Sequence, residues 1–165
     1  MNSGFAKKAA FLGISLALCI ALSWLDSLLS AVMPVPGLRL GLANTVICAV
    51  LMKYSVKEGF AMSLLRSGFV VLTRGAVSGI MSLCGGMAAF IVTALLISRK
   101  RLNVRTVSVL AAAAHIVGQL AAACVIMGTV RVLYYGIFLL PAAVVTGFCT
   151  GTILDRLTKS NVFIK

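Results

Sequence analysis

Long apolar runs separated by short clusters of charged and turn-forming residues cover nearly the whole chain. Taking these clusters as boundaries predicts six apolar segments, at residues 9–29, 41–53, 59–74, 76–98, 106–128 and 133–155. Several approach or exceed the ~20 residues that a helix needs to cross ~30 Å of hydrocarbon. The second and third are short for a full crossing. A membrane barrel needs strands of about ten residues with alternating polarity, and no such alternation is present.

The pattern therefore predicts an all-α integral membrane bundle of six transmembrane helices, with residues 1–165 forming a single transmembrane domain. Composition agrees with this prediction. Hydrophobic residues make up 61% of the chain and its mean hydropathy is +1.12, whereas soluble domains contain about 45–50% apolar residues.

The distribution of charge supports the segment count, because cytoplasmic loops of membrane proteins are rich in Lys and Arg. With the N-terminus inside, 11 of the 15 basic residues are cytoplasmic. They are Lys7, Lys8, Lys53, Lys57, Arg99, Lys100, Arg101, Arg105, Arg156, Lys159 and Lys165. Arg39, Arg74 and Arg131 fall outside, and Arg66 lies within a segment. We therefore expect a multi-pass protein of the cell membrane with both termini cytoplasmic.

The net charge of +12 is then mostly a topology signal, aided by attraction to anionic lipid heads, and predicts membrane lipids rather than nucleic acid as partners.

The alternative for the first segment is a secretory signal, with Lys7 and Lys8 before an apolar run and small residues at Ala21 and Ser23. Its removal would leave five segments and spoil the alternation of charge.

Arg66 is the first candidate functional residue, because a charge at the bilayer centre costs about 2.5–3.5 kcal/mol on insertion scales. Ser63 and Ser67 accompany it on the same helix, so we expect this polar stripe to point inward. The alternatives are that Arg66 reaches a lipid head group or forms a structural ion pair.

His115 and Gln119 form a second polar pair within the fifth segment. Their i,i+4 spacing places them on one helix face, and Gly118 beside them allows a neighbour or a ligand to approach closely. The alternative is a hydrogen-bonded packing histidine, which is common between membrane helices.

A third group surrounds the turn PVPGLRLGLAN at residues 34–44. We expect Asp26, Arg39 and Asn44 at the outer end of the bundle and the Arg66 and His115 groups near its middle, all converging on one outward pocket. Because arginine pairs bidentately with carboxylate and phosphate oxygens, this set predicts a small-molecule substrate with an anionic group. Arg39 would act as a lid or clamp over the pocket; the alternatives are a rigid connector at 34–44 and a structural ion pair of Asp26 with Arg39 or Arg66.

Small residues recur every four positions on one face of the first segment. They are Ala9, Gly13, Ala17 and Ala21. In lipid, such a strip lets another helix approach closely. The strip serves either internal packing or docking of a second protein, and periodicity does not separate the two.

Motifs for catalysis or for a metal are missing from the sequence. The P-loop pattern GxxxxGKS or GxxxxGKT is absent, and no arrangement typical of a hydrolase is present. The three acids, Asp26, Glu58 and Asp155, are far apart in sequence. The five cysteines lack metal-binding spacing, and we expect them to be buried within the segments. We therefore expect no enzyme, no metal and no cofactor.

Five stretches carry a resemblance to a known family. They are PGLRLGLAN at 36–44, LLRSG at 64–68, SLCGGMAAF at 82–90, AHIVGQL at 114–120 and YYGIFLLPAAVVTGFCTG at 134–151. In this order they resemble the Gx transporter family, often labelled heptaprenyl diphosphate synthase component I. That family is similar to the S components of energy-coupling factor (ECF) transporters, which are six-helix bundles that bind substrate.

The resemblance implies capture of a vitamin-like or precursor-like molecule from outside, with a transmembrane coupling protein and two ATPase subunits of an ECF module supplying the energy. In S components an alanine-rich strip on the first helix meets the coupling protein, which implies this role for Ala9, Gly13, Ala17 and Ala21, although Gly13 departs from alanine. The loop after the first helix is a gate in S components, which fits residues 34–44.

The alternative function is a non-transporting membrane subunit of a prenyl diphosphate, quinone or redox-related complex. The synthase label also suggests an enzyme of prenyl diphosphates, but the chain lacks the DDxxD motifs of such enzymes.

Overall fold

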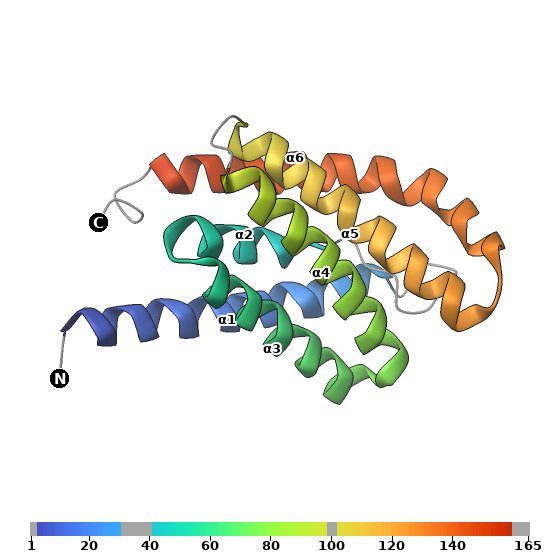
Figure 1. The fold of residues 1–165 in the computed structure, drawn as a ribbon, viewed down its shortest axis with the longest axis horizontal. Coiled ribbons are helices and arrows are strands. Elements are labelled where there is room, and N and C mark those ends of the chain that lie inside the picture. Colours follow the sequence, from blue (N-terminus) through green and yellow to red (C-terminus); the bar gives the residue numbers. More distant parts are fainter. Residues whose placement is uncertain (1–2, 31–40, 99–101, 160–165) are drawn as a thin grey trace.

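The computed structural model describes residues 3–30, 41–98 and 102–159, and within these ranges the chain forms six α-helices and one short 3₁₀ helix (Figure 1). The elements are α1 (Ser3–Ser30), α2 (Asn44–Lys53), α3 (Val56–Arg74), α4 (Ala76–Ser98), α5 (Val104–Met127), η1 (Val130–Tyr135) and α6 (Gly136–Lys159). The all-α prediction is confirmed. Helices α1 and α6 extend beyond the predicted apolar segments because a helix continues through the charged residues at its end.

Four of the described helices are long and apolar enough to cross a membrane. They are the segments Gly4–Leu28, Ala76–Ser98, Val104–Met127 and Val130–Lys159. At 1.5 Å per residue, α2 is about 15 Å long and α3 about 28 Å. Helix α3 has sufficient length, but Lys57, Glu58, Arg66 and Arg74 reduce its hydropathy. The protein is therefore a membrane protein, and α2 is too short to cross alone.

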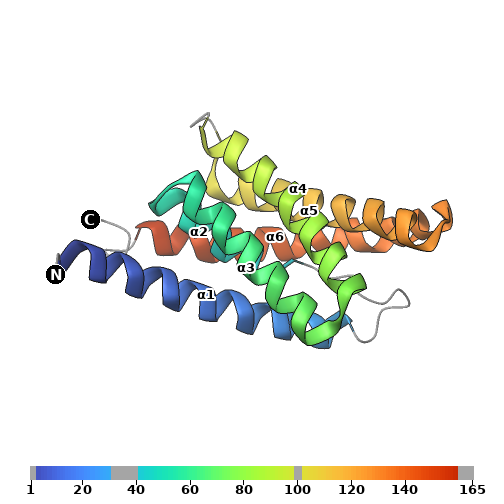
Figure 2. The ribbon, with the colours of Figure 1, turned by 60° about the horizontal axis from the view of Figure 1, so that its bottom comes forward.

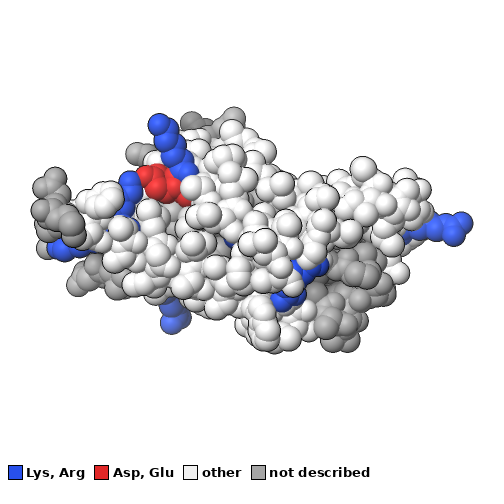
Figure 3. Space-filling view, turned by 90° about the horizontal axis from the view of Figure 1, so that it is seen from below, with Lys and Arg blue, Asp and Glu red and all other residues white. Residues whose placement is uncertain are grey.

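The two ends of the molecule differ in charge. The start of α1, the α2–α3 turn, the start of α5 and the end of α6 lie towards one end, and the α3–α4 and α5–η1 turns towards the other (Figures 1 and 2). The elements at the first end carry seven of the ten described basic residues, namely Lys7, Lys8, Lys53, Lys57, Arg105, Arg156 and Lys159. The second end has Arg74 and Arg131. Figure 3 shows one face of the molecule, most of which is uncharged.

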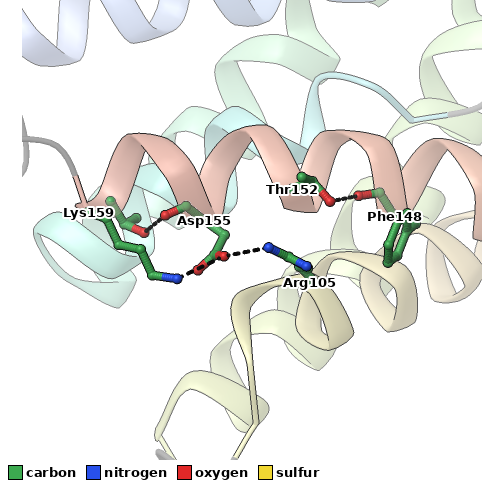
Figure 4. Close-up of polar contacts among 6 residues, drawn as sticks. Arg105, Phe148, Thr152, Asp155 and Lys159 are labelled. Carbon is green, nitrogen blue, oxygen red and sulfur yellow. Dashed lines mark hydrogen bonds and ion pairs between the residues drawn. The ribbon is translucent and has the colours of Figure 1, made fainter.

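Ion pairs join helices at the basic end. Lys8 of α1 pairs with Glu58 of α3. Asp155 of α6 accepts hydrogen bonds from Nη2 of Arg105 on α5, at 3.1 Å, and from Nζ of Lys159, at 3.1 Å (Figure 4). Because exposed ion pairs contribute only about 0–1 kcal/mol each, these contacts help to orient the helix ends, and packing within the bundle provides most of the stability.

Glu58 provides a test of the contact between α1 and α3. Hydrogen bonds donated by Lys8 and then by Ser55 lower the pKa of its carboxyl group from 4.5 to about 2. A lowered native pKa means that the stabilising contribution is complete above about pH 4.5 and is lost as the pH falls through about 2. We expect Glu58→Gln to flatten the dependence of the unfolding temperature on pH between these values, and Lys8→Gln to do so in part. Equal slopes for wild type and Glu58→Gln would contradict this contact.

Three apolar clusters lie among the described residues. One, on α1 to α4, includes Cys19, Val50, Leu51, Met62 and Phe90. A second, on α4, α5, η1 and α6, contains Met81, Ile116, Leu120, Leu139 and Ala143 among its buried members. The third and smallest has Cys48, Val107 and Leu154 as its buried members. The buried polar residues of α1 to α5 belong to none of these clusters, and they define the candidate site.

Candidate functional site

Nine buried polar side chains from five helices form what we call the polar cluster. They are Ser23, Asp26, Asn44, Ser63, Arg66, Ser67, Ser82, His115 and Gln119. The two ionisable groups of opposite charge, Asp26 and Arg66, are both 0% exposed. Because buried charges are expensive unless they are paired or hydrogen-bonded, the contacts of these residues show how the fold accommodates them.

Arg66 connects three helices. Its Nε donates a hydrogen bond to Oγ of Ser23 on α1, at 2.8 Å, and its Nη1 donates to Oδ1 of Asn44 on α2, also at 2.8 Å. Both acceptors are neutral, and these are the hydrogen bonds of Arg66 among the described residues. The guanidinium group is fully buried, so the alternative in which Arg66 reaches a lipid head group does not apply. Asp26, which was considered as an ion-pair partner of Arg66, is not among these hydrogen-bond partners.

Asp26 holds the entry to α2. Its Oδ2 accepts hydrogen bonds from the backbone N–H groups of Gly41, at 2.8 Å, and Leu42, at 3.3 Å. These donors precede the first turn of α2, where a negative charge is favourable. Gly41 adopts a φ of +83°, which glycine tolerates best. Asp26 therefore fixes the position of Asn44, the first residue of α2, beside Arg66.

His115 and Gln119 approach the cluster from α5, and the predicted stacking on one buried face is confirmed, since both are 0% exposed. Glycines surround the histidine ring. A Cβ atom on Gly41 would lie 2.7 Å from Cδ2 of His115 and 2.8 Å from Nδ2 of Asn44. A Cβ on Gly85 of α4 would lie 2.9 Å from Cε1 of His115 and 2.6 Å from Cγ of Gln119. The ring thus lies against backbone on two sides.

The pair Gly85 and Gly86 joins the two halves of the cluster. While Gly85 contacts α5, a Cβ on Gly86 would lie 3.2 Å from Oγ of Ser63 and 3.9 Å from Nη1 of Arg66 on α3. The polar residues of α3 and α5 therefore contact adjacent residues of one short stretch of α4. Gly118 brings α4 and α5 together in the same way, since a Cβ there would lie 2.7 Å from the carbonyl oxygen of Cys84.

Several buried polar atoms of the cluster have no hydrogen-bond partner within the described ranges. They are Nδ2 of Asn44, Oγ of Ser63, Nη2 of Arg66, Oγ of Ser67 and Oγ of Ser82. Each unsatisfied buried group costs about 1–3 kcal/mol, and most native proteins have few of them. All five atoms are able to donate a hydrogen bond. Chemically, this arrangement fits an acceptor-rich group such as a carboxylate or phosphate.

A small cavity borders the cluster between α2, α5 and α6. It is lined by Gly41, Asn44, Cys48, Ser108, Thr146 and neighbouring residues, and its volume is about 10 Å³; Asn44 is the one member of the polar cluster that lines it. This space is enough for about one water molecule, whereas small-molecule pockets typically enclose about 300–1,000 Å³. The side chains of Arg66, His115 and Gln119 are 0% exposed, so admission of a small molecule to the cluster requires the helices to separate.

Some sequence-based expectations are revised by these positions. The sequence predicts that Asn44 and Arg66 converge from the outer end and the middle of the bundle, and their hydrogen bond brings the two side chains together. Cys84 and Cys149 are exposed and Cys124 is half-buried, so the expectation of five buried cysteines is wrong; Cys19 and Cys48 are buried. Arg39, with most of the 34–44 turn, lies outside the described residues.

Ser23, Gly41, Gly85 and Gly86 were not predicted as part of the site. For Ser23, a signal was available, since Cys19, Ser23 and Asp26 follow one another at helical spacing on the buried side of α1. The glycines of α4 stand in one of the family-like stretches, but their role depends on which helices pack against that face. Sequence alone does not give those neighbours.

The strip on α1 faces away from the bundle. Ala9, Gly13, Ala17 and Ala21 are all exposed, and a Cβ on Gly13 would meet nothing within 4 Å. Of the two roles considered above, packing within this chain therefore does not account for the strip. Large apolar side chains flank it, including Ile14 and Trp24, which are 71% and 56% exposed.

Among the described residues, no group of three or more His, Cys, Asp or Glu side chains is placed to hold a metal ion. Comparison with protein families gave a match over residues 16–157 to the model described as heptaprenyl diphosphate synthase component I. Comparisons with curated proteins and with solved structures gave no match.

Proposed function

Because the chain belongs to the heptaprenyl diphosphate synthase component I family, the Gx transporter family of the sequence analysis, we propose that it is a substrate-binding subunit of an ECF-type transporter. In this role it captures a small anionic molecule from outside the cell. The family name refers to one component of a synthase, and the proposal gives that component a binding role rather than a catalytic one.

The observation that carries the proposal is the environment of Arg66. A fully buried arginine hydrogen-bonded to neutral Ser23 and Asn44 keeps Nη2 available, and the hydroxyl groups of Ser63 and Ser67 lie on the same helix. A purely structural arginine would normally have its donors satisfied. A carboxylate or phosphate on the ligand would accept these hydrogen bonds and balance the charge. His115 and Gln119 would complete the site from α5, and Asp26 would support it by positioning Asn44.

The proposed topology has six passes with both termini cytoplasmic. The start of α1 and the end of α6 lie towards the same end of the molecule (Figures 1 and 2), as an even number of passes requires. The seven-to-two excess of described basic residues at that end supports its cytoplasmic location in the cell membrane. Helix α2 is too short to cross alone, and most of the 34–44 turn that precedes it lies outside the described residues.

Entry of the ligand would involve α1 and α2. Among the described elements, α1 packs against α2 and α3 only, and Asp26 links it to the entry of α2. Movement of this pair away from α3 to α5 would break the bonds of Arg66 to Ser23 and Asn44. A ligand anion would then replace Ser23 and Asn44 as the acceptor of the hydrogen bonds that Arg66 donates.

The exposed strip on α1 is the proposed docking surface for the transmembrane coupling protein, which in turn binds the ATPase subunits. We expect Ala17→Trp to reduce copurification of these partners at least tenfold, because the indole would separate the two helices. The unfolding temperature of the isolated subunit should change little, since substitutions on exposed surfaces usually shift stability by less than about 0.5 kcal/mol.

The matched control is Ala61→Trp, which places the same side chain on the exposed surface of α3. It should leave copurification unchanged. Recovery of the same proteins with Ala17→Trp as with wild type would contradict docking at the strip. Absence of a coupling protein and ATPases from the wild-type preparation, with a redox or prenyl-synthase complex in their place, would favour the second candidate.

The second candidate is a non-transporting subunit of a prenyl diphosphate, quinone or redox-related complex. The name of the family, which refers to a synthase component, favours it. It predicts that substitutions in the polar cluster leave small-molecule uptake unaffected. If the chain were itself the enzyme, the purified protein would turn over a prenyl diphosphate with Mg²⁺.

A further inference from the structure

An apolar groove runs along the side of the bundle between α1 and α6, with α2 as its floor. Its volume is about 380 Å³. Phe11, Leu18 and Leu22 line it from α1, Ala49 from α2, and Ile153 and Leu157 from α6. Helices α1 and α6 are both candidate membrane spans, so the groove opens towards lipid. It is distinct from the polar cluster, and it borders the α1 strip at Ile14.

The spacing along α1 shows how the groove lies relative to the strip. At 100° per residue, Gly13 and Ala17 lie more than a quarter of a turn from Phe11, Leu18 and Leu22, whereas Ala21 lies about 60° from Leu18. Ile14 flanks the strip and also lines the groove. A molecule in the groove therefore leaves Gly13 accessible and borders the strip at Ile14 and Ala21.

Two lysine side chains lie next to the groove at the basic end of the molecule. Lys53 lies one turn beyond Ala49 on α2, and its Nζ is 4.3 Å from the ring centroid of Phe11. Lys7 precedes Phe11 by four residues on α1, so it lies on the same helix face one turn further out, and it is exposed. The groove thus has an apolar channel within the membrane and positive charge at one mouth.

We propose that this groove binds one anionic phospholipid, with an acyl chain between α1 and α6 and the phosphate beside Lys53 and Lys7. The argument rests on charge complementarity. An apolar channel alone would accept any acyl chain, but cations at the level of the head group select a negatively charged one, at about 1 kcal/mol for each Lys near the membrane surface. The inference requires only that the chain spans a membrane, so it is independent of the transport proposal.

Tryptophan fluorescence in bilayers tests the inference directly. Trp24 is the only tryptophan, so the variant Trp24→Phe with Leu18→Trp carries a single fluorophore in the groove. The full-length protein is placed in bilayers with increasing fractions of phosphatidylglycerol or phosphatidylcholine carrying brominated acyl chains, which quench tryptophan on contact. We expect brominated phosphatidylglycerol to bind at least fivefold more tightly than brominated phosphatidylcholine.

Matched variants identify the groups responsible. Lys53→Gln and Lys7→Gln should each reduce the preference for phosphatidylglycerol about fivefold or abolish it, whereas Lys57→Gln, at the same end of the molecule but on α3, should leave it unchanged. A control fluorophore, Ile91→Trp with Trp24→Phe, lies on the exposed face of α4 and should show no preference. If the Leu18→Trp protein does not fold, Ile14→Trp reports from the same groove.

Equal affinity for the two lipids in the groove, or the same preference at residues 18 and 91, would overturn the proposal. No quenching at residue 18 would also overturn it, because a protein segment or a second copy of the chain would then cover the groove. A preference that persists in both Lys53→Gln and Lys7→Gln would exclude the assigned phosphate position.

Discussion

Replacing Arg66 by methionine is expected to weaken ligand binding at least a hundredfold while changing the free energy of unfolding of the unliganded protein by no more than about 2 kcal/mol. Loss of charged hydrogen bonds to a ligand costs about 1.5–3 kcal/mol each, and a hundredfold change corresponds to about 2.7 kcal/mol. The small change in stability follows because methionine removes the desolvation cost of a buried charge together with the hydrogen bonds to Ser23 and Asn44.

Arg66→Lys separates charge from geometry. Lysine keeps the positive charge but lacks the planar fork that pairs with two oxygens, so we expect binding intermediate between wild type and Arg66→Met. Binding is measured with the small molecule that copurifies with the wild type, and stability by thermal unfolding in detergent. A large loss of stability in Arg66→Met, with any loss of binding only in proportion, would mean that Arg66 is a structural residue.

The second large effect is expected for Gly41→Ala. The new Cβ would meet the His115 ring at 2.7 Å and the Asn44 amide at 2.8 Å, in a backbone conformation with φ of +83°. A left-handed conformation costs a non-glycine residue about 1–2 kcal/mol, and overpacking typically costs about 1–3 kcal/mol more. We expect a loss of about 2–5 kcal/mol in unfolding free energy and a loss of ligand binding.

Gly75→Ala is the matched control. Gly75 has the same φ of +83°, but a Cβ there meets nothing within 4 Å, so it carries the backbone strain without the clash. The difference between the two variants measures how tightly His115 and Asn44 are packed against the entry to α2. Equal destabilisation, with ligand binding retained in both, would show that these contacts are not critical to the site.

The order and class of the helices were predictable from the sequence because lipid imposes simple constraints. Apolar length and the placement of Lys and Arg located all six helices, and the cost of a buried charge identified Arg66 as a residue sheltered by protein. The inward face shared by His115 and Gln119 followed from helical periodicity. Each of these inferences depends on a single helix and its solvent.

Contacts between helices were less predictable. Asp26 was expected to bind a ligand or pair with an arginine, and the hydrogen bonds that its Oδ2 accepts from the backbone at Gly41 and Leu42 were not predicted. The hydrogen bond of Asn44 with Arg66 was not predictable either, because the position of the short helix α2 depends on the tertiary fold. The close contacts of Gly85 with α5 and of Gly86 with α3 likewise depend on how these helices pack against α4. The binding role of the cluster stays a prediction.

The central claim is that the polar cluster shelters Arg66 because an anionic solute binds there. The most direct measurement is untargeted mass spectrometry of the small molecules that copurify with wild type, with Arg66→Met, and with Leu72→Met, an exposed position on the same helix. The account predicts one carboxylate- or phosphate-bearing compound, near one equivalent per chain in wild type and Leu72→Met and absent from Arg66→Met. An identical small-molecule profile in all three proteins would contradict it.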